Sequence, residues 1–165
     1  MNTKKQKDII QSYVLACKKE NKTVLITKGV FDIIHPDHIK MLNRLSKLAD
    51  VLIVLLIPDW AVSVMKPNRP ILEESARLAV VGSLKPVTKS FIDYDSRDSD
   101  TNKYSRDIDV EIMKSISPDM WAMNKGQLAK FEKYNIGNTK LVAFDEGNEY
   151  STTKIIDKIL VKYSK

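Results

Sequence analysis

The feature that most constrains the fold is an almost unbroken apolar segment at residues 50–57, which reads DVLIVLLI. A strand that is apolar on both faces has to be covered on both sides, as the central strands of parallel sheets are. A shorter β-branched run at residues 23–27 has the same character. Neighbouring parallel strands are joined by long crossover connections, which are usually helices. We therefore expect a parallel sheet with helices on both of its faces.

The rest of the chain alternates short apolar runs with amphipathic segments, which is the pattern of an α/β protein. Strands are expected at residues 23–27, 50–57, 90–94, 120–123 and 141–144, and helices at residues 4–20, 38–49, 73–84, 108–116, 128–134 and 151–161. This alternation implies a parallel sheet with right-handed crossovers. We expect it to be a Rossmann-like, five-stranded sheet in the order 3-2-1-4-5, although the element order does not by itself fix the strand order. Ligands bind outside the carboxyl ends of the strands where such a chain reverses direction, between strands one and four.

Three regions carry more specific expectations. Pro67 and Pro70 keep the last part of the connection at residues 61–70 from being helical. Residues 93–107 are strongly polar and would form either an active-site loop or an ordinary surface excursion. The N-terminal helix would pack on the sheet edge or on a partner subunit.

Composition excludes several classes of protein. The single cysteine, Cys17, cannot form a disulfide within the chain, which fits a reducing cytoplasm. The longest apolar run is too short to span a bilayer. The chain has no P-loop and no dinucleotide-binding glycine motif, and two histidines and one cysteine are too few for a structural zinc site. The formal charge of +6 is compatible with binding to nucleic acid and equally with binding to a phosphorylated small molecule.

The turn after the first expected strand contains both histidines of the chain, His35 and His38, in the segment GVFDIIHPDH at residues 29–38. Pro36 and Asp37 suit the first turn of a helix. A helix start attracts anions, because its free backbone N–H groups point outward and its dipole adds positive potential. Residues three apart share one helix face, so both imidazoles can face one phosphate and stabilise it during transfer.

A second motif, Ser151-Thr152-Thr153, follows the last expected strand and opens the last helix. A hydroxyl cap with free backbone N–H groups makes a second phosphate cradle, to which Lys154 adds a cation. The alternative is that Ser151 merely caps the helix, which is the commoner role of an isolated motif of this kind.

Together the two motifs resemble the cytidylyltransferase-like nucleotidyltransferases. Residues 29–38 are similar to the family signature G-x-F-D-x-x-H-x-G-H, and residues 151–153 to its S-T-T motif. Residues 59–77 resemble a segment of the heptose-phosphate adenylyltransferases, and the sequence STTKI at residues 151–155 is similar to glycerol-3-phosphate cytidylyltransferases. The resemblance implies an N-terminal helix at residues 1–20 and a nucleotidyltransferase domain at residues 21–165, within a single domain overall.

The resemblance also implies an activity and a set of site residues. The enzyme would transfer an NMP from ATP or CTP to the phosphate of a small sugar or polyol phosphate, release pyrophosphate and use Mg²⁺. His35, His38 and Lys66 would be catalytic. The nucleotide would be bound by Thr27, Lys28, Gly29, Phe31, Asp37, Lys125, Ser151, Thr152 and Thr153. A cytoplasmic location is expected, and a homodimer is possible by analogy with the family. No membrane partner is expected, and a nucleic-acid partner is not favoured.

Some of these residues have ordinary alternatives. Lys66 could be a solvated loop lysine, and Arg77 could be a helix-surface arginine that pairs with Glu73 four residues earlier. Asp32 is expected to have a structural role, with its carboxylate accepting backbone N–H bonds in the signature turn.

Asp37 stands where the family signature has glycine. A carboxylate about 5 Å from a phosphate charge costs on the order of 3 kcal/mol at an effective dielectric near 20. Two compensations are open: Mg²⁺ could bridge Asp37 to the phosphates, or Lys28 could neutralise it across the turn. The alternative function is a nucleotide-binding or regulatory homologue in which Asp37 has impaired catalysis.

Overall fold

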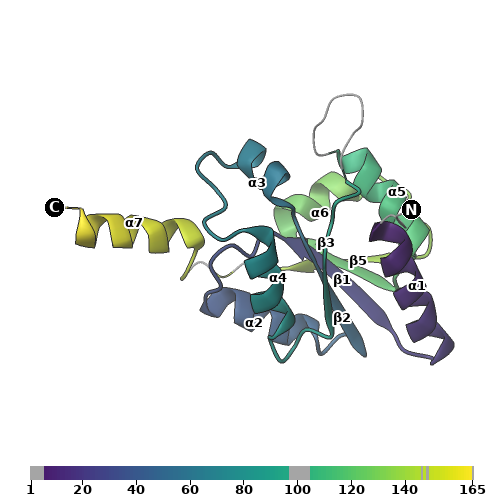
Figure 1. Ribbon diagram of the computed structural model, residues 1–165. Helices are drawn as coiled ribbons and strands as arrows, with labels where there is room; N and C mark the ends of the chain where they lie inside the picture. The colour runs from purple at the N-terminus through teal and green to yellow at the C-terminus, as the bar shows by residue number, and fades with distance from the viewer. Residues whose placement is uncertain (1–5, 97–104, 146, 148, 165) are drawn as a thin grey trace, which may run out of the picture.

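A computed structural model of the chain describes residues 6–96, 105–145, 147 and 149–164. Its centre is one parallel sheet in the order β3-β2-β1-β4-β5, which confirms the expected fold class and strand order (Figure 1). The strands are β1 (Val24–Gly29), β2 (Val51–Leu56), β3 (Lys89–Ile92), β4 (Met120–Asn124) and β5 (Lys140–Phe144). Of the polar segment at residues 93–107, residues 97–104 lie outside the described residues.

Helices cover both faces of the sheet, as the two-sided apolar strands require. The first face is covered by α1 (Gln6–Lys19), α5 (Arg106–Ile116) and α6 (Lys125–Phe131), and the second by α2 (Pro36–Leu45) and α4 (Glu74–Gly82). The short helix α3 (Asp59–Met65) follows β2, and α7 (Thr152–Tyr163) extends away from the sheet (Figure 1). Within the described part of the chain, no helix is both long enough and apolar enough to cross a lipid bilayer.

The N-terminal helix packs on a face of the sheet, so neither of its two expected positions is the one observed. Ile10, Val14 and Cys17 of α1 are buried in one apolar cluster with Val110 and Met113 of α5. These side chains cover strands that would otherwise expose apolar surface on that face. Helix α1 is thus part of the core.

Two helices differ from the expectation, and in both a polar side chain accepts a bond from a backbone N–H at the start of the helix. Helix α3 was not expected, and it is joined to α4 by reciprocal bonds: the Asp59 N–H donates to Glu74 (2.8 Å) and the Glu74 N–H to Asp59 (3.0 Å). Helix α6 was expected at residues 128–134 but begins at Lys125. The Asn124 side chain caps it by accepting a bond from the Gln127 N–H at 2.8 Å.

Candidate functional site

A cavity of about 390 Å³ lies where β1 and β4 end, at the predicted reversal of chain direction. It is lined by the signature turn, the end of α3, the start of α6 and the segment that leads into α7. The predicted residues that it brings together are Lys28, Gly29, Phe31, His35, Asp37, His38, Lys66, Ser151, Thr152 and Thr153. Two motifs more than a hundred residues apart in sequence therefore face one space.

Two predicted residues lie outside this lining. Thr27 is buried within β1, where its hydroxyl donates to the Ala122 carbonyl at 3.1 Å. Lys125 is exposed and forms an ion pair with Asp145 at 2.7 Å.

Other residues line the cavity that were not among the predicted site residues, although Met65 and Arg69 belong to the segment at residues 59–77 for which a resemblance was found. They are chiefly Met41, Met65, Arg69, Asn124, Gln127, Phe144, Gly147 and Tyr150. For Asn124 a signal was available, because asparagine is a preferred helix cap and here directly precedes a helix. The apolar members carried no such signal, since methionine and phenylalanine are ordinary core residues.

The histidine pair is stacked at the start of α2. Extended backbone at His35 (φ −141°, ψ 167°) precedes Pro36, the first helical residue. The two imidazole rings lie with their centroids 3.7 Å apart and their planes 20° apart, and the His38 ring contacts Phe31 at 5.2 Å. The Nδ1 atoms of both rings are buried and have no hydrogen-bond partner among the described residues. Both rings are thus fixed side by side on the cavity wall.

Gly29 and Phe31 shape the turn that holds these rings. Phe31 adopts a positive φ of 50°, and its ring packs over Gly29. A Cβ atom at position 29 would lie 2.8 Å from the Phe31 ring, so only glycine fits there without displacing the ring. Both residues therefore have a structural role in the turn, and both also line the cavity.

Both histidines are neutral near pH 7. Burial lowers the pKa of His38 to about 4, and the neighbouring His35 and Lys66 act in the same direction. Burial also lowers the pKa of His35, while Asp37 partly opposes the change. A neutral imidazole has one N–H donor, so each ring can donate one hydrogen bond to an anion in the cavity.

The pKa of His38 predicts how stability depends on pH. Between about pH 6.5 and pH 4 the unfolded chain binds a proton at His38 that the folded chain does not, so stability falls as the pH decreases. We would measure the free energy of unfolding of the wild type and of His38→Asn in urea. The difference between the two proteins, wild type minus variant, should fall by about 2 kcal/mol from pH 7 to pH 4.5. Equal pH dependence in the two proteins would contradict the low pKa.

The cations of the cavity differ in their pairing. Lys28 contacts Asp93 and Asp109 in a buried cluster, and its side chain is only 7% exposed. Arg69 is paired with Asp32. Lys66, at the end of α3, is exposed, and the described residues form no ion pair with it. Lys66 is therefore the cavity cation best placed to meet an anionic ligand.

Asp32 has the structural role that we predicted. Its buried carboxylate accepts hydrogen bonds from the N–H groups of Ile71 (2.9 Å) and Leu72 (2.8 Å) and pairs with Arg69. Burial by itself would raise the pKa of Asp32, but these hydrogen bonds and the ion pair lower it below its ordinary value. The carboxylate thereby connects the signature turn to the segment that follows α3.

Arg77 does not lie on a helix surface, so the alternative of a surface pairing with Glu73 is wrong. Its side chain is fully buried, and its guanidinium donates to the carbonyls of Val30, Ile57 and Leu72. It also forms an ion pair with Asp59 at 2.6 Å. Arg77 joins the ends of β1 and β2 to the starts of α3 and α4, a position that helix periodicity could not reveal.

Asp37 is buried and well supplied with donors. Its Oδ2 accepts bonds from the N–H groups of Tyr150 (2.8 Å) and Glu149 (3.1 Å), and Lys40 Nζ lies 3.6 Å from its Oδ1. The Tyr150 N–H, with help from Lys40, lowers the pKa of the Asp37 carboxyl, against the effect of burial. The predicted neutralisation by Lys28 is not found, because Lys28 is held by Asp93 and Asp109.

The carboxylate of Asp37 is only partly occupied: both N–H donors bond to Oδ2, and Oδ1 has Lys40 Nζ at 3.6 Å. A Mg²⁺ ion at this carboxylate would need further oxygen ligands, such as phosphate oxygens, to complete its octahedral geometry. Within the described residues, no group of three or more His, Cys, Asp or Glu side chains could hold a metal ion.

The S-T-T motif begins α7 at the cavity wall. The Ser151 side chain caps the helix by accepting a bond from the Lys154 N–H at 3.1 Å. The cap is compatible with an anion cradle, because Ser151, Thr152 and Thr153 all line the cavity. The starts of α2 and α7 therefore face the same space.

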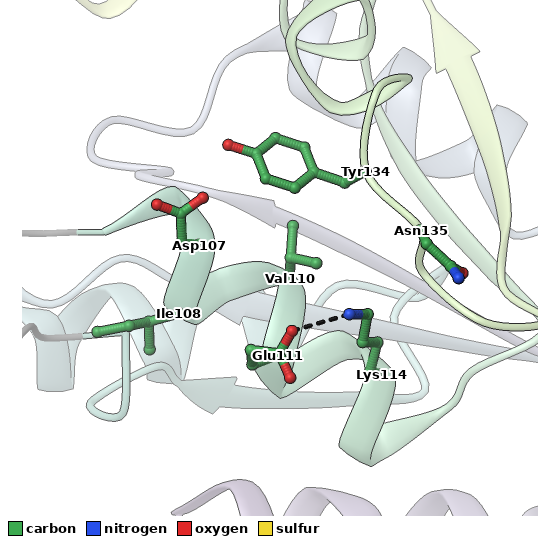
Figure 2. Close-up of a pocket in the computed structure, with 7 residues that line it drawn as sticks. All are labelled: Asp107, Ile108, Val110, Glu111, Lys114, Tyr134 and Asn135. Atoms are coloured by element: carbon green, nitrogen blue, oxygen red, sulfur yellow. Dashed lines mark hydrogen bonds and ion pairs between the residues drawn. The ribbon is translucent and has the colours of Figure 1, made fainter.

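A smaller hollow of about 280 Å³ lies elsewhere, between α5 and the residues that follow α6. Figure 2 shows Tyr134 and Asn135 opposite side chains of α5, where Glu111 and Lys114 are paired at 2.8 Å. A hydrogen bond with Asp107 raises the pKa of Tyr134. None of the predicted site residues lines this hollow, so the larger cavity is the candidate site.

Comparison with known proteins shows relatives that match this chain over most of its length. The chain is 32% identical over 155 residues to the bifunctional protein HldE of Campylobacter jejuni, covering 90% of this chain and 30% of that protein. It is 28% identical over 168 residues to the bifunctional protein HldE of Trichlorobacter lovleyi, covering 97% of this chain and 31% of that protein. The chain thus spans less than a third of the length of these relatives.

A solved structure supports the same grouping. The lipopolysaccharide core biosynthesis protein of Thermoplasma volcanium has a TM-score of 0.55 and 25% sequence identity, over 77% of this chain and 99% of that one. The family model described as cytidylyltransferase-like matches residues 26–158, which include the strand before the histidine turn and most of α7. The chain therefore belongs to the cytidylyltransferase-like family.

Proposed function

We propose that the chain is a nucleotidyltransferase that moves an NMP from ATP or CTP to the phosphate of a small sugar or polyol phosphate. The observation that carries the proposal is the convergence of the stacked His35 and His38 with Ser151, Thr152 and Thr153 on one cavity. Two helix starts at a single cavity suit a ligand with several phosphates. Membership of the cytidylyltransferase-like family supports the same class of reaction.

The reaction needs no covalent enzyme intermediate. A phosphate oxygen of the acceptor attacks the α-phosphorus in line, the bond from that phosphorus to the β-bridging oxygen breaks, and pyrophosphate leaves. His35 and His38 would donate hydrogen bonds to the α-phosphate as its charge rearranges. Lys66 would meet phosphate charge, and Ser151, Thr152 and Thr153 would hold the β- and γ-phosphates. Catalysis would then consist of positioning and electrostatic stabilisation.

A sugar phosphate is the acceptor that the comparisons favour. The Thermoplasma protein is one of lipopolysaccharide core biosynthesis, and a lipopolysaccharide core is built from sugars. The two HldE relatives match this chain over most of its length. We therefore place sugar phosphates ahead of polyol phosphates as acceptors.

The test is a pyrophosphate-release assay with the purified chain, Mg²⁺ and either ATP or CTP. The acceptor panel would contain a heptose 1-phosphate, hexose 1-phosphates and glycerol 3-phosphate, with an acceptor-free control. We expect release that depends on one nucleotide and on a sugar phosphate. A folded protein that releases no pyrophosphate with any combination would overturn the proposal.

Asp37 favours a second candidate, a nucleotide-binding or regulatory member of the family without turnover. Its carboxylate replaces the glycine of the signature at the cavity wall. This candidate predicts nucleotide binding in calorimetry together with no pyrophosphate release. It also predicts that Asp37→Gly binds nucleotide more tightly than the wild type, because a negative charge is removed.

A further inference from the structure

The carboxylate of Asp37 connects two parts of the cavity that are distant in sequence. Asp37 lies in the first turn of α2, and the N–H groups that it accepts belong to Glu149 and Tyr150, just before α7. Lys40, one turn further along α2, adds a second link through its ion pair with Glu149 at 3.0 Å. The segment before Ser151 is therefore attached to the helix that carries His38.

Gly147 fits against the same carboxylate. A Cβ atom at position 147 would lie 2.2 Å from Cγ of Asp37 and 2.4 Å and 2.6 Å from its two oxygens. Real Cβ atoms do not approach other atoms so closely, so a side chain at position 147 would displace either the carboxylate or the segment. Glycine at position 147 therefore leaves the space that the Asp37 carboxylate fills.

These contacts give the carboxylate a geometric role. The family signature has glycine at position 37, and in this chain the space beside that position is filled by a carboxylate whose neighbour is Gly147. Two backbone N–H groups and a lysine surround the charge, so the carboxylate holds the backbone of residues 149–150 in place. Because Ser151 directly follows Tyr150, fixing residues 149–150 also fixes the start of α7.

We propose that Asp37 is a positioning residue for the triphosphate: together with Gly147 it holds the start of α7 opposite the histidine pair. The proposal rests on the proposed function, because it assigns the start of α7 to the β- and γ-phosphates. It makes Asp37 and Gly147 a matched pair, so the effects of changing them must be coupled.

The test uses four proteins: the wild type, Asp37→Gly, Gly147→Ala and the double variant. Nucleotide affinity is measured by calorimetry with ATP and CTP in the presence of Mg²⁺. We expect each single variant to bind about tenfold more weakly, since a charge-assisted hydrogen bond is worth about a factor of ten or more. The double variant should bind more tightly than Gly147→Ala, because removing the carboxylate relieves the clash.

Steady-state kinetics give a second readout. A positioning role for the triphosphate predicts a raised KM for the nucleotide in Asp37→Gly, with kcat changed much less. Asp37→Asn, which keeps one acceptor oxygen, should lie between Asp37→Gly and the wild type. Asp50→Gly is the matched control, because Asp50 also accepts the N–H of a neighbouring segment, Thr23, but lies outside the cavity.

A third readout needs no ligand and no turnover. Amide hydrogen exchange at Glu149 and Tyr150 should become faster in Asp37→Gly and stay unchanged in Asp50→Gly. Faster exchange in a chain that releases no pyrophosphate would overturn the proposed function and leave the anchoring by Asp37 supported. Unchanged exchange, additive affinities in the four proteins, or tighter nucleotide binding by Asp37→Gly would each overturn the positioning role.

Discussion

Replacement of His38 with alanine is expected to lower the rate of pyrophosphate release by about 100- to 1,000-fold, which is the usual loss when one preorganised hydrogen-bond donor is removed from a transition state. The imidazole is neutral, stacked on His35 at 3.7 Å and fixed beside Phe31, so its N–H is positioned before the ligand arrives. Water that fills the space left by the ring is not fixed in position. Ordering it in the transition state would raise the activation free energy, so water does not replace the imidazole donor. The measurement is kcat with the preferred nucleotide and acceptor.

Two controls separate this effect from a loss of folding. Asn43→Ala removes an exposed side chain from the same helix and should leave kcat unchanged. Thermal unfolding of His38→Ala should remain cooperative, because Phe31, which the ring contacts, is also buried in an apolar cluster of which His38 is not a member. If folded His38→Ala released pyrophosphate at a rate within a few-fold of the wild type, His38 would have no catalytic role.

Replacement of Arg77 with leucine is expected to destabilise the protein by about 3 kcal/mol, and thus to lower the melting temperature by about 10 °C for a chain of this size. The guanidinium is fully buried and donates to three carbonyl oxygens and to Asp59. Leucine fills much of the volume but leaves those acceptors without a donor. Urea unfolding at pH 7 measures the effect directly.

The chain offers graded controls for Arg77. Arg77→Lys keeps the charge but cannot reach all four acceptors, so it should lose a smaller part of the stability. Arg44→Ala removes an exposed arginine from α2 and should change the free energy of unfolding by less than about 0.5 kcal/mol. If Arg77→Leu were as stable as Arg44→Ala, the buried network would not contribute to folding.

Much of the architecture could be predicted because its signals are local. Residues 51–56 are apolar on both faces, and this pattern alone requires a strand that is covered on both sides. The histidine turn was recognisable because Pro36 suits the start of a helix, which also explains why His35 and His38 face the same way. Ser151 was recognisable for the same reason, as a cap before an amphipathic segment.

The errors in the prediction have one physical origin. Helices α3 and α6 depend on polar side chains that bond to backbone groups, Glu74 on Asp59 and Asn124 on Gln127, rather than on apolar periodicity. Helix α1 was misplaced because an amphipathic stripe shows that a helix packs but not against which surface. Its partner, α5, lies nearly a hundred residues further along the chain.

Local patterns were thus sufficient to predict the fold class and the two motifs that line one cavity. The pairing of buried charges depended on long-range packing: Lys28 with Asp93 and Asp109, Arg77 with Asp59 and Asp37 with Tyr150. Each carboxylate and each cation has several plausible partners in sequence, and the choice depends on which backbone groups and side chains the folded chain brings within about 3 Å. For this reason the sequence indicated that Asp37 would be an unpaired charge beside the ligand. In the folded protein its carboxylate accepts two backbone N–H groups and lies near Lys40.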